Sequence, residues 1–315
     1  MTSSPLPNIY VLYENPDWIP PLQEGLEKEG FSVCLVHVND GIIDPSKTSH
    51  KGIWINRISA SSHTRDHIHT VEMSRQLLFW LESQGRRVIN GIQTFELEMS
   101  KFRQDLILRR HGIKTPQTVL AIGRDNLLKT AGSFDGPFIT KHDQGGKGLG
   151  IKLFQDFDEF ENYISKKEFD SGPGNRMIIQ EYISAPEPFV TRVEIVGGQF
   201  LFAMRSSTLQ GFELCPSDIC NPTSTNQNGT CPAGNGIFSP SPITAKDPLV
   251  QQYIQLCQKE GLEIAGIEFV EDANGSRYTY DINCTTNYNQ ALGSQLGIDG
   301  MREVARYIRK TAMSN

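Results

Sequence analysis

The first ninety residues alternate between short β-rich runs and helix-like segments, and this order limits the folds that the chain can adopt. A β-rich run at 8–13 (NIYVLY) is followed by a helical segment at about 17–29, which ends at Gly30, and then by a second β-rich run at 31–38. A strand, a helix and a strand joined by short links form a right-handed βαβ unit. The sequence therefore predicts an N-terminal α/β domain with a parallel sheet.

The rest of the chain predicts two further units. Another strand, a helix and a fourth strand follow at 52–58, 64–85 and 86–90. Later helices are predicted at about 99–111, 157–166, 248–259 and 299–311, and later strands at 118–122, 137–141, 150–154 and 176–183, with a pair turning at Gly197-Gly198 and a hairpin at 264–283. We predict three units, at 1–95, 96–183 and 184–315, the last with a long loop at 209–245.

Composition excludes several classes of protein. The 315 residues are 38% apolar and 21% charged, which suits a globular protein with its own core. Lys and Arg total 30 against 36 for Asp and Glu, so the net charge of −6 argues against nucleic acid or an anionic membrane as a partner. No stretch of eighteen apolar residues could span a membrane. Six cysteines without an export signal predict a cytoplasmic protein, and the spacing of Cys215, Cys220 and Cys231 matches no familiar zinc module.

A glycine-rich stretch follows the predicted strand at 137–141. Lys141 is placed at the exposed end of that strand, and a second strand follows the stretch. The glycines are Gly145, Gly146, Gly148 and Gly150. Glycines let backbone N–H groups approach an anion closely, and a lysine supplies a point charge. The loop is neither a Walker A motif nor a Rossmann fingerprint, because both lead into a helix. Phosphate binding is one interpretation, and a glycine-rich hairpin without a ligand is the other.

The segment 264–283 (IAGIEFVEDANGSRYTYDIN) predicts a hairpin with an acidic face. Asn274-Gly275 is the favoured pair for a two-residue turn, and counting back from it places Glu268 opposite Asp281. Because strand side chains alternate, Asn283 shares their face. Like charges directly opposite each other destabilise a strand pair, and magnesium held by these oxygens would offset the repulsion. A solvated face without metal is the alternative, and a three-residue turn would shift the register and separate the acids.

These motifs, in their order along nearly the whole chain, resemble the ATP-grasp superfamily. The ordered set is Lys101, Lys141 with its glycine loop, the QEYI segment (180–183), Glu268 and Asp281-Ile282-Asn283. It is most similar to the RimK-type ligases, which add glutamate or similar amino acids to a carboxyl group. The resemblance implies that the N-terminal α/β domain precedes a two-lobed ATP-grasp fold.

The resemblance also implies a role for each residue of the set. Those implied to contact ATP are Lys101 and Lys141 at the phosphates, Gly145, Gly146 and Gly148 above them, Gln180, Glu181, Tyr182 and Ile183 at the adenine, and Glu187 at the ribose. Those implied to hold magnesium, for which manganese could substitute, are Glu268, Asp281 and Asn283. The arginines implied to contact phosphate or the acyl intermediate are Arg192 and Arg205.

The activity that the resemblance implies is an ATP-dependent carboxylate–amine ligation. The γ-phosphoryl group of ATP would pass to a carboxylate, and an amine would displace phosphate from the resulting acyl phosphate. The expected partners are a small-molecule or peptide carboxylate and an amine or amino acid, and the sequence leaves a homo-oligomer open. A small-molecule kinase and a non-catalytic ATP-binding module are the alternatives.

Overall fold

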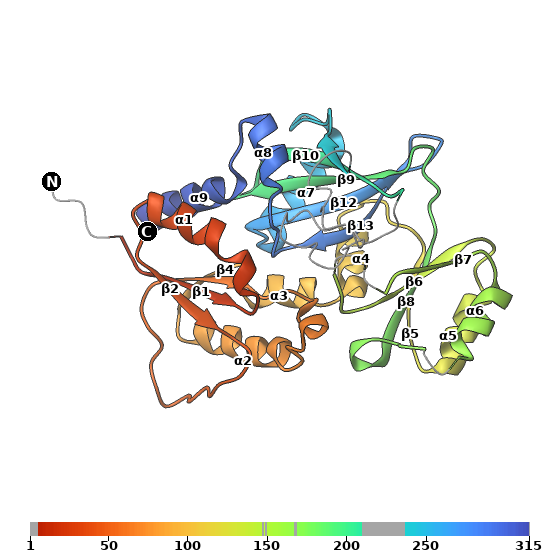
Figure 1. Ribbon diagram of the computed structural model, residues 1–315, viewed down its shortest axis with the longest axis horizontal. Helices are drawn as coiled ribbons and strands as arrows, with labels where there is room; N and C mark the ends of the chain where they lie inside the picture. Colours follow the sequence, from red (N-terminus) through yellow and green to blue (C-terminus); the bar gives the residue numbers. More distant parts are fainter. Residues whose placement is uncertain (1–5, 147, 149, 167–168, 210–236, 315) are drawn as a thin grey trace, which may run out of the picture.

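The structure is a computed structural model that describes residues 6–146, 148, 150–166, 169–209 and 237–314. Its strands form three sheets, arranged side by side in the ribbon of Figure 1. One sheet falls within each of the predicted units, and the predicted mixed α/β class is confirmed. Cys215, Cys220, Cys231 and most of the predicted 209–245 loop lie outside the described residues.

The N-terminal sheet is parallel throughout, as the βαβ pattern predicts. Its strand order is β2-β1-β3-β4. The strands are β1 (Ile9–Tyr13), β2 (Val33–His37), β3 (Ile53–Arg57) and β4 (Arg87–Ile89). The helices are α1 (Pro20–Lys28) and α2 (Thr70–Ser83), with 3-10 turns η1 (Pro16–Trp18) and η2 (Ser62–Arg65). The helix predicted at 64–85 is therefore shorter, because Asp66 adopts a left-handed φ of 62° and ends η2.

The central sheet is antiparallel, with strand order β5-β8-β6-β7. The strands are β5 (Thr118–Ile122), β6 (Phe138–His142), β7 (Lys152–Phe154) and β8 (Arg176–Glu181), and η3 (Pro173–Asn175) precedes β8. Helices α5 (Arg124–Ala131) and α6 (Phe157–Ile164) lie together beside this sheet (Figure 1). Phe138, Phe154 and Phe160 are buried between helices and sheet and form edge and tilted ring contacts.

The C-terminal sheet is the largest, with strand order β11-β10-β9-β12-β13. The strands are β9 (Phe189–Val196), β10 (Gln199–Ser207), β11 (Phe238–Pro240), β12 (Ile264–Glu271) and β13 (Arg277–Asn283). The helices are α7 (Pro248–Glu260), α8 (Gln290–Leu296) and α9 (Gly300–Ser314). β9 and β10 turn at Gly197-Gly198, both with positive φ, as predicted. β11 lies inside the segment that we predicted to be loop, where it pairs with β10.

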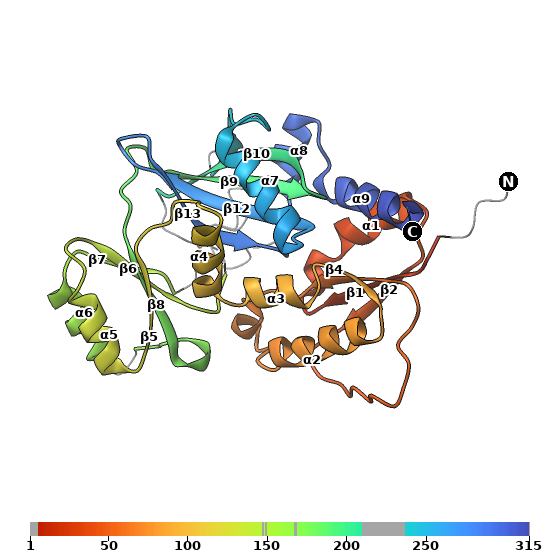
Figure 2. The ribbon, with the colours of Figure 1, turned by 180° about the vertical axis from the view of Figure 1, so that it is seen from behind.

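The helix predicted at about 99–111 is confirmed, and a second, short helix that was not predicted precedes it. The short helix is α3 (Ile92–Glu98) and the predicted one is α4 (Lys101–Arg110), and Ser100 between them caps α4 by accepting a hydrogen bond from the Arg103 backbone N–H at 3.2 Å. Leu108 of α4 is buried with Tyr253 of α7 in the core of the C-terminal sheet, and Figure 2 shows α4 near β13. The residues that lead into the central sheet are therefore anchored on the C-terminal sheet.

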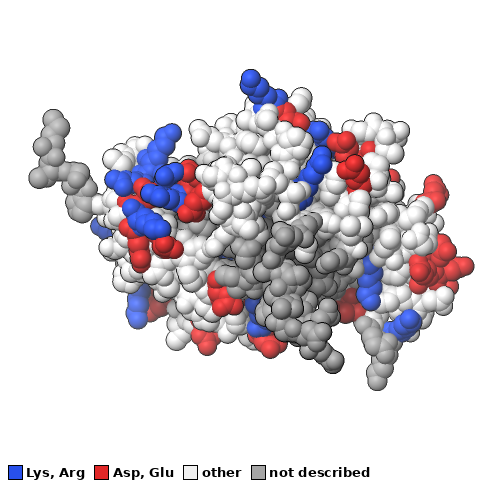
Figure 3. Space-filling model, turned by 45° about the horizontal axis from the view of Figure 1, so that its top comes forward, with Lys and Arg blue, Asp and Glu red and all other residues white. Residues whose placement is uncertain are grey.

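The last helix returns to the N-terminal sheet. α9 and α1 lie side by side in both ribbon views (Figures 1 and 2), and Met301 and Ile308 share a core with Ile9. At this end Figure 3 shows basic and acidic side chains mixed together. The contacts there join Glu29 to Arg302, Arg306 and Arg309 at 3.4–3.8 Å. Within the described residues, no helix is both long and apolar enough to cross a membrane.

Candidate active site

A cavity of about 380 Å³ has walls from all three sheets. Ser59 and Ala60 come from the segment after β3, Trp18 comes from η1, and Glu98 and Lys101 come from α3 and α4. The other walls come from the central and C-terminal sheets and the segments next to them. The structure brings together most of the predicted site residues: Lys101, Lys141, Gly145, Gly146, Gly148, Gln180, Glu181, Tyr182, Ile183, Arg192, Glu268, Asp281 and Asn283 all line this cavity. Glu187 and Arg205 are not among its lining residues.

The acidic hairpin has the predicted pairing but not the predicted turn. Glu268 lies directly opposite Asp281, whereas the next pair is Phe269 with Thr279, so Tyr280 is the extra residue of a β-bulge. The Asp272 backbone N–H donates to the Ser276 carbonyl at 2.9 Å, which makes the turn three residues long. The two-residue turn is therefore wrong, and the bulge restores the register that the longer turn shifts.

The repulsion between these acids is offset by cations of the protein itself. Glu268 accepts hydrogen bonds from Arg192 Nη1 at 2.8 Å and from the Tyr280 hydroxyl at 3.1 Å. Asp281 forms an ion pair with Lys101 and accepts from Asn283 Nδ2 at 3.1 Å. Burial opposes ionisation of Asp281, but the charges of Lys101 and Lys141 outweigh it and hold the pKa of this carboxyl below its ordinary value. A metal is therefore not required to explain why two acids face each other.

The oxygen donors of this corner nevertheless fit a magnesium ion. Two carboxylates and the amide oxygen of Asn283 lie on one face and line the cavity, and hard oxygen ligands of this kind are those that Mg²⁺ prefers. The side chains of Glu268 and Asp281 are 14% and 16% exposed, so both reach the cavity. Among the described residues, no group of three or more His, Cys, Asp or Glu side chains could hold a metal, so any fit depends on the amide.

The two lysines approach this corner from different elements. Lys101 begins α4, where Asp143 fixes it: the Lys101 backbone N–H donates to the Asp143 carbonyl at 2.9 Å, and Ser100 Oγ donates to the Asp143 carboxylate at 2.9 Å. Lys141 is not at an exposed strand end, as we predicted, but is buried within β6, where its Nζ donates to Gln180 Oε1 at 3.0 Å. Burial, together with the nearby charge of Lys101, lowers the pKa of Lys141 to about 8.

Arg192 is buried at the centre of β9 and joins the acids to the segment after β13. Its guanidinium donates to Glu194 at 2.5 Å and to the Thr286 hydroxyl at 2.8 Å, in addition to its bond with Glu268. Burial alone would lower the pKa of Arg192, but Glu194 and Glu268 raise it above its ordinary value. A Cβ on Gly266 would lie 2.2 Å from Arg192 Nη2, so the guanidinium occupies space that only glycine leaves open.

Arg205 and Glu187 lie apart from this arrangement. Arg205 on β10 pairs with Thr191, the neighbour of Arg192, so it projects from the opposite face of the sheet. Its guanidinium carbon lies 4.2 Å from the centroid of the Phe189 ring. Glu187 precedes β9. The phosphate role of Arg205 and the ribose role of Glu187 stay predictions without support from the cavity.

The predicted adenine segment joins the central sheet to the cavity. Gln180 donates through Nε2 to the Thr118 hydroxyl at 2.7 Å and accepts from Lys141, so its side chain is fixed at both ends. The backbone N–H of Glu181 donates to the Gln117 carbonyl, and that of Tyr182 donates to the Pro137 carbonyl. The chain from Gln180 to Ile183 is therefore an ordered edge of the cavity.

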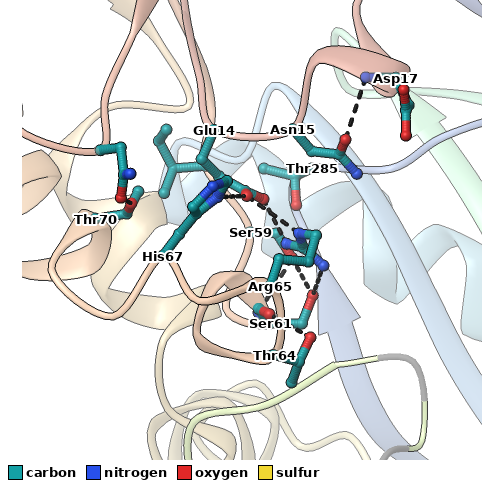
Figure 4. Close-up of polar contacts among 12 residues, drawn as sticks. Glu14, Asn15, Asp17, Ser59, Ser61, Thr64, Arg65, His67, Thr70 and Thr285 are labelled. Atoms are coloured by element: carbon teal, nitrogen blue, oxygen red, sulfur yellow. Dashed lines mark hydrogen bonds and ion pairs between the residues drawn. The ribbon is translucent and has the colours of Figure 1, made fainter.

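Sequence reasoning did not single out Glu14, although it organises the N-terminal wall (Figure 4). Its buried carboxylate forms an ion pair with Arg65 and a hydrogen bond with His67 Nδ1 at 2.9 Å. Arg65 Nη1 also donates to Ser61 Oγ at 3.2 Å. A Cβ on Gly146 would lie 3.6 Å from Ser61 Cβ, so this wall touches the glycine loop. The network positions the segment that carries Ser59 and Ala60.

Glu98 is a second residue that sequence reasoning missed. It lines the cavity from the end of α3, is 5% exposed, and accepts a hydrogen bond from the Thr285 hydroxyl at 2.5 Å. The two residues are 187 positions apart, so the sequence carries no local signal of their contact. Burial raises the pKa of the Glu98 carboxyl to about 7, and Thr285, Lys101 and Arg57 oppose that rise.

Comparison with solved structures identifies the fold. The RimK domain ATP-grasp protein of Sphaerobacter thermophilus superposes with a TM-score of 0.70 at 16% identity, covering 95% of this chain and 98% of that one. D-alanyl-alanine synthetase A of Vibrio cholerae also gives 0.70, at 13% identity, covering 99% of this chain and 100% of that one. The fold is that of the ATP-grasp ligases.

Sequence comparison finds one matching domain family and several related proteins. Residues 99–213 match the family model of the RimK-like ATP-grasp domain. Beta-citrylglutamate synthase B of Danio rerio is 23% identical over 231 residues, which are 72% of this chain and 52% of that protein. A probable alpha-L-glutamate ligase of Haemophilus influenzae is 22% identical over 250 residues, which are 78% of this chain and 74% of that protein. The chain thus matches about half the length of the first relative.

Proposed function

We propose that this protein is an ATP- and magnesium-dependent ligase that joins a carboxylate to an amine through an acyl phosphate. The observation that carries the proposal is the convergence of Lys101, Lys141 and Arg192 with two carboxylates at one corner of a cavity. Phosphoryl transfer needs positioning and neutralisation of charge more than a nucleophilic side chain, and these residues supply both.

ATP is proposed to lie along the cavity from the adenine segment to the acidic corner. Gln180 to Ile183 would border the adenine, Lys141 and Lys101 would contact the phosphates, and the glycine loop would cover them. Glu268, Asp281 and Asn283 would hold the magnesium, which when bound neutralises charge on the transferring phosphoryl group. Glu187 and Arg205 are left out of this assignment because neither lines the cavity.

The reacting carboxylate is proposed to lie between Arg192 and the γ-phosphate. A carboxylate is a poor acylating agent, so phosphoryl transfer must precede attack by the amine. Arg192 is held rigidly by two acids and Thr286, and a preorganised cation of this kind stabilises charge that develops on the carbonyl oxygen. The walls from Ser59 and the glycine loop would have to exclude water from the acyl phosphate, because water would hydrolyse it.

Names of the similar proteins support amino acids as substrates. A citrylglutamate synthase, an alpha-L-glutamate ligase and an alpha-aminoadipate–LysW ligase are among the relatives, and a solved ATP-grasp ligase of the same fold is described with magnesium, ADP and a peptide precursor variant. We therefore propose an amino acid, glutamate first, as the amine, and a small-molecule or peptide carboxylate as the acid.

The test is ADP release in the presence of magnesium, ATP and pairs drawn from a panel of carboxylates and amines. The carboxylates include citrate, L-2-aminoadipate and N-acetyl-L-glutamate, and the amines include each L-amino acid. Ligation predicts phosphate and ADP in equal amounts, both dependent on the pair. A phosphorylated product without free phosphate would instead identify a kinase, and tight ATP binding without turnover would identify a binding module.

A further inference from the structure

A further wall of the cavity adjoins the proposed magnesium corner, and Arg192 links the two through its hydrogen bond to Thr286. This wall consists of Ser59 and Ala60 from the segment after β3, Glu98 from α3, and the segment 285–287 that follows β13. Acidic residues among the described lining are Glu98, Glu181, Glu268 and Asp281. Of these, Glu268 and Asp281 form the proposed magnesium corner and Glu181 lies in the proposed adenine segment, so Glu98 is the acid of the further wall.

One carboxylate oxygen of Glu98 is hydrogen-bonded, and the other is buried without a hydrogen bond from the described residues. Oε1 accepts from the Thr285 hydroxyl, whereas Oε2 is buried and has no hydrogen-bond partner within the described structure. An unpartnered buried carboxylate oxygen is costly, and a donor from a ligand in the cavity would satisfy it. The side chain itself is more than nine-tenths buried, so it is held in place before a ligand arrives.

The segment opposite Glu98 is rigid for a separate reason. Arg57 at the end of β3 is 4% exposed and donates through Nη1 to the Thr286 carbonyl at 2.8 Å and through Nη2 to Asn287 Oδ1 at 2.5 Å. These bonds fix the backbone that carries Thr285, and Thr285 in turn orients the Glu98 carboxylate. Arg57 and Thr285 are therefore positioning residues for Glu98.

The two regions differ in the hydrogen-bonding groups that they leave unpaired in the described part of the chain, although the charges of Lys101 and Arg57 also act on Glu98. The corner with Arg192 and Lys101 suits anions, namely phosphate and the carboxylate to be activated, whereas a carboxylate with a free acceptor oxygen suits a cationic donor. The second substrate of the proposed ligation is an amine, which enters from water as an ammonium ion. We infer that Glu98 binds the ammonium group of the incoming amine substrate and removes a proton from it. This inference depends on the proposed ligase function.

One N–H proton moves from the ammonium group to Glu98 Oε2, which leaves a neutral amine with a lone pair. The nitrogen attacks the carbonyl carbon of the acyl phosphate, a C–N bond forms, the C–O bond to phosphate breaks, and its electron pair leaves with phosphate. The second N–H proton passes to the departing phosphate. A carboxyl group whose pKa is raised to about 7 by burial is suited to exchange a proton at neutral pH.

Glu98→Gln tests this role, because it keeps an acceptor for Thr285 and loses the charge. Two amines are compared, hydroxylamine and the L-amino acid that gives product in the panel. Hydroxylamine is uncharged at neutral pH and captures an acyl phosphate as a hydroxamate without needing an ammonium site. We expect wild-type rates of hydroxamate formation by Glu98→Gln, and a fall of about 30-fold or more in kcat/KM for the amino acid. Glu98→Asp, which keeps the charge, should fall less.

Glu96→Gln is the matched control, since Glu96 is also on α3 but pairs with Arg75 and Arg103 outside the cavity lining. It should leave both reactions unchanged. An unchanged kcat/KM for the amino acid in Glu98→Gln would overturn the inference, and so would an equal loss of both reactions. If the wild-type protein forms no hydroxamate with any carboxylate of the panel, the proposed function fails, and the inference about Glu98 fails with it.

Discussion

Lys101 at the start of α4 forms an ion pair with Asp281 on β13, 180 residues later in the chain. The lysine is 9% exposed and the aspartate side chain 16% exposed, so solvent screens this pair only weakly. Because Asp281 also faces Glu268 across the hairpin, Lys101 is needed to stabilise the acidic corner as well as to contact phosphate.

Lys101→Met is therefore expected to destabilise the fold. Removing one partner of a buried ion pair leaves the other charge uncompensated, which costs about 3 kcal/mol in the free energy of unfolding. A double-mutant cycle measures the coupling free energy between Lys101 and Asp281. It uses urea denaturation of the wild type, Lys101→Met, Asp281→Asn and the double variant. The double variant should be less destabilised than Lys101→Met alone, since it removes the orphaned charge. Equal stability of Lys101→Met and the wild type would contradict the structural role.

Lys141 and Lys152 belong to the same hairpin but differ in burial, which gives a matched pair for nucleotide binding. Lys141 is buried and lines the cavity, whereas Lys152 on β7 is exposed and lies over the Tyr163 ring. Lys141→Met should weaken ATP binding about tenfold or more, because a hydrogen bond to a charged group is worth about 1.5 to 3 kcal/mol. Lys152→Met should leave the Kd unchanged. Calorimetric titration with the non-hydrolysed analogue AMPPNP and magnesium measures both.

The lowered pKa of Lys141 adds a pH dependence to the same experiment. Wild-type affinity should fall as the pH rises through about 8, where Lys141 loses its proton. Lys141→Met should show a flatter profile. A wild-type affinity that stays constant from neutral pH to pH 9, or an equal loss in the Lys141 and Lys152 variants, would argue against a phosphate contact by Lys141.

Titration of Glu98 should make the free energy of unfolding depend on pH. The pKa of Glu98 is raised by burial to about 7 in the folded protein and is near 4.5 when unfolded. The stabilisation that comes from the protonated Glu98 carboxyl is therefore fully present below the unfolded pKa, and it is lost as the pH rises through the folded pKa. Each pKa unit corresponds to about 1.4 kcal/mol, so Glu98→Gln should gain up to about 3 kcal/mol relative to the wild type between pH 4.5 and pH 8. Unfolding by urea at both pH values measures the difference, and a constant difference would contradict the prediction.

The sequence indicated much of this site because its chemistry is concentrated in short motifs. The β-rich runs correctly predicted the parallel N-terminal sheet. The lysines, glycines and acids of the ordered motifs line one cavity. The pairing of Glu268 with Asp281 was right although the turn was wrong, because the bulge at Tyr280 compensates for the third turn residue. Bulges depend on packing around both strands, so local turn statistics do not reveal them.

Other features depend on contacts between distant segments and could not be predicted locally. Lys141 looked exposed because it precedes a glycine loop, yet Gln180 and the C-terminal sheet bury it. Glu98 was missed because its hydrogen-bond partner, Thr285, lies 187 residues later in the chain. The separation of α3 from α4 depends on Ser100, which both caps α4 and donates to Asp143.

Gly266 offers a test of Arg192 that leaves the arginine itself in place. A Cβ at this position would lie 2.2 Å from Arg192 Nη2 and 2.5 Å from its Cζ, so Gly266→Ala must displace the guanidinium from Glu268. We expect kcat for ligation to fall at least about tenfold, with about 1 to 3 kcal/mol lost in stability from overpacking.

Gly275→Ala on the same hairpin is the control. A Cβ there would meet no atom within 4 Å, and the positive φ of 75° accounts for a cost of about 1 kcal/mol. It should therefore lower the urea midpoint without changing kcat. If Gly266→Ala retains wild-type kcat while its stability falls, the position of the Arg192 guanidinium does not limit the reaction, and the catalytic part of the proposal must be carried by Lys101 and the acids instead.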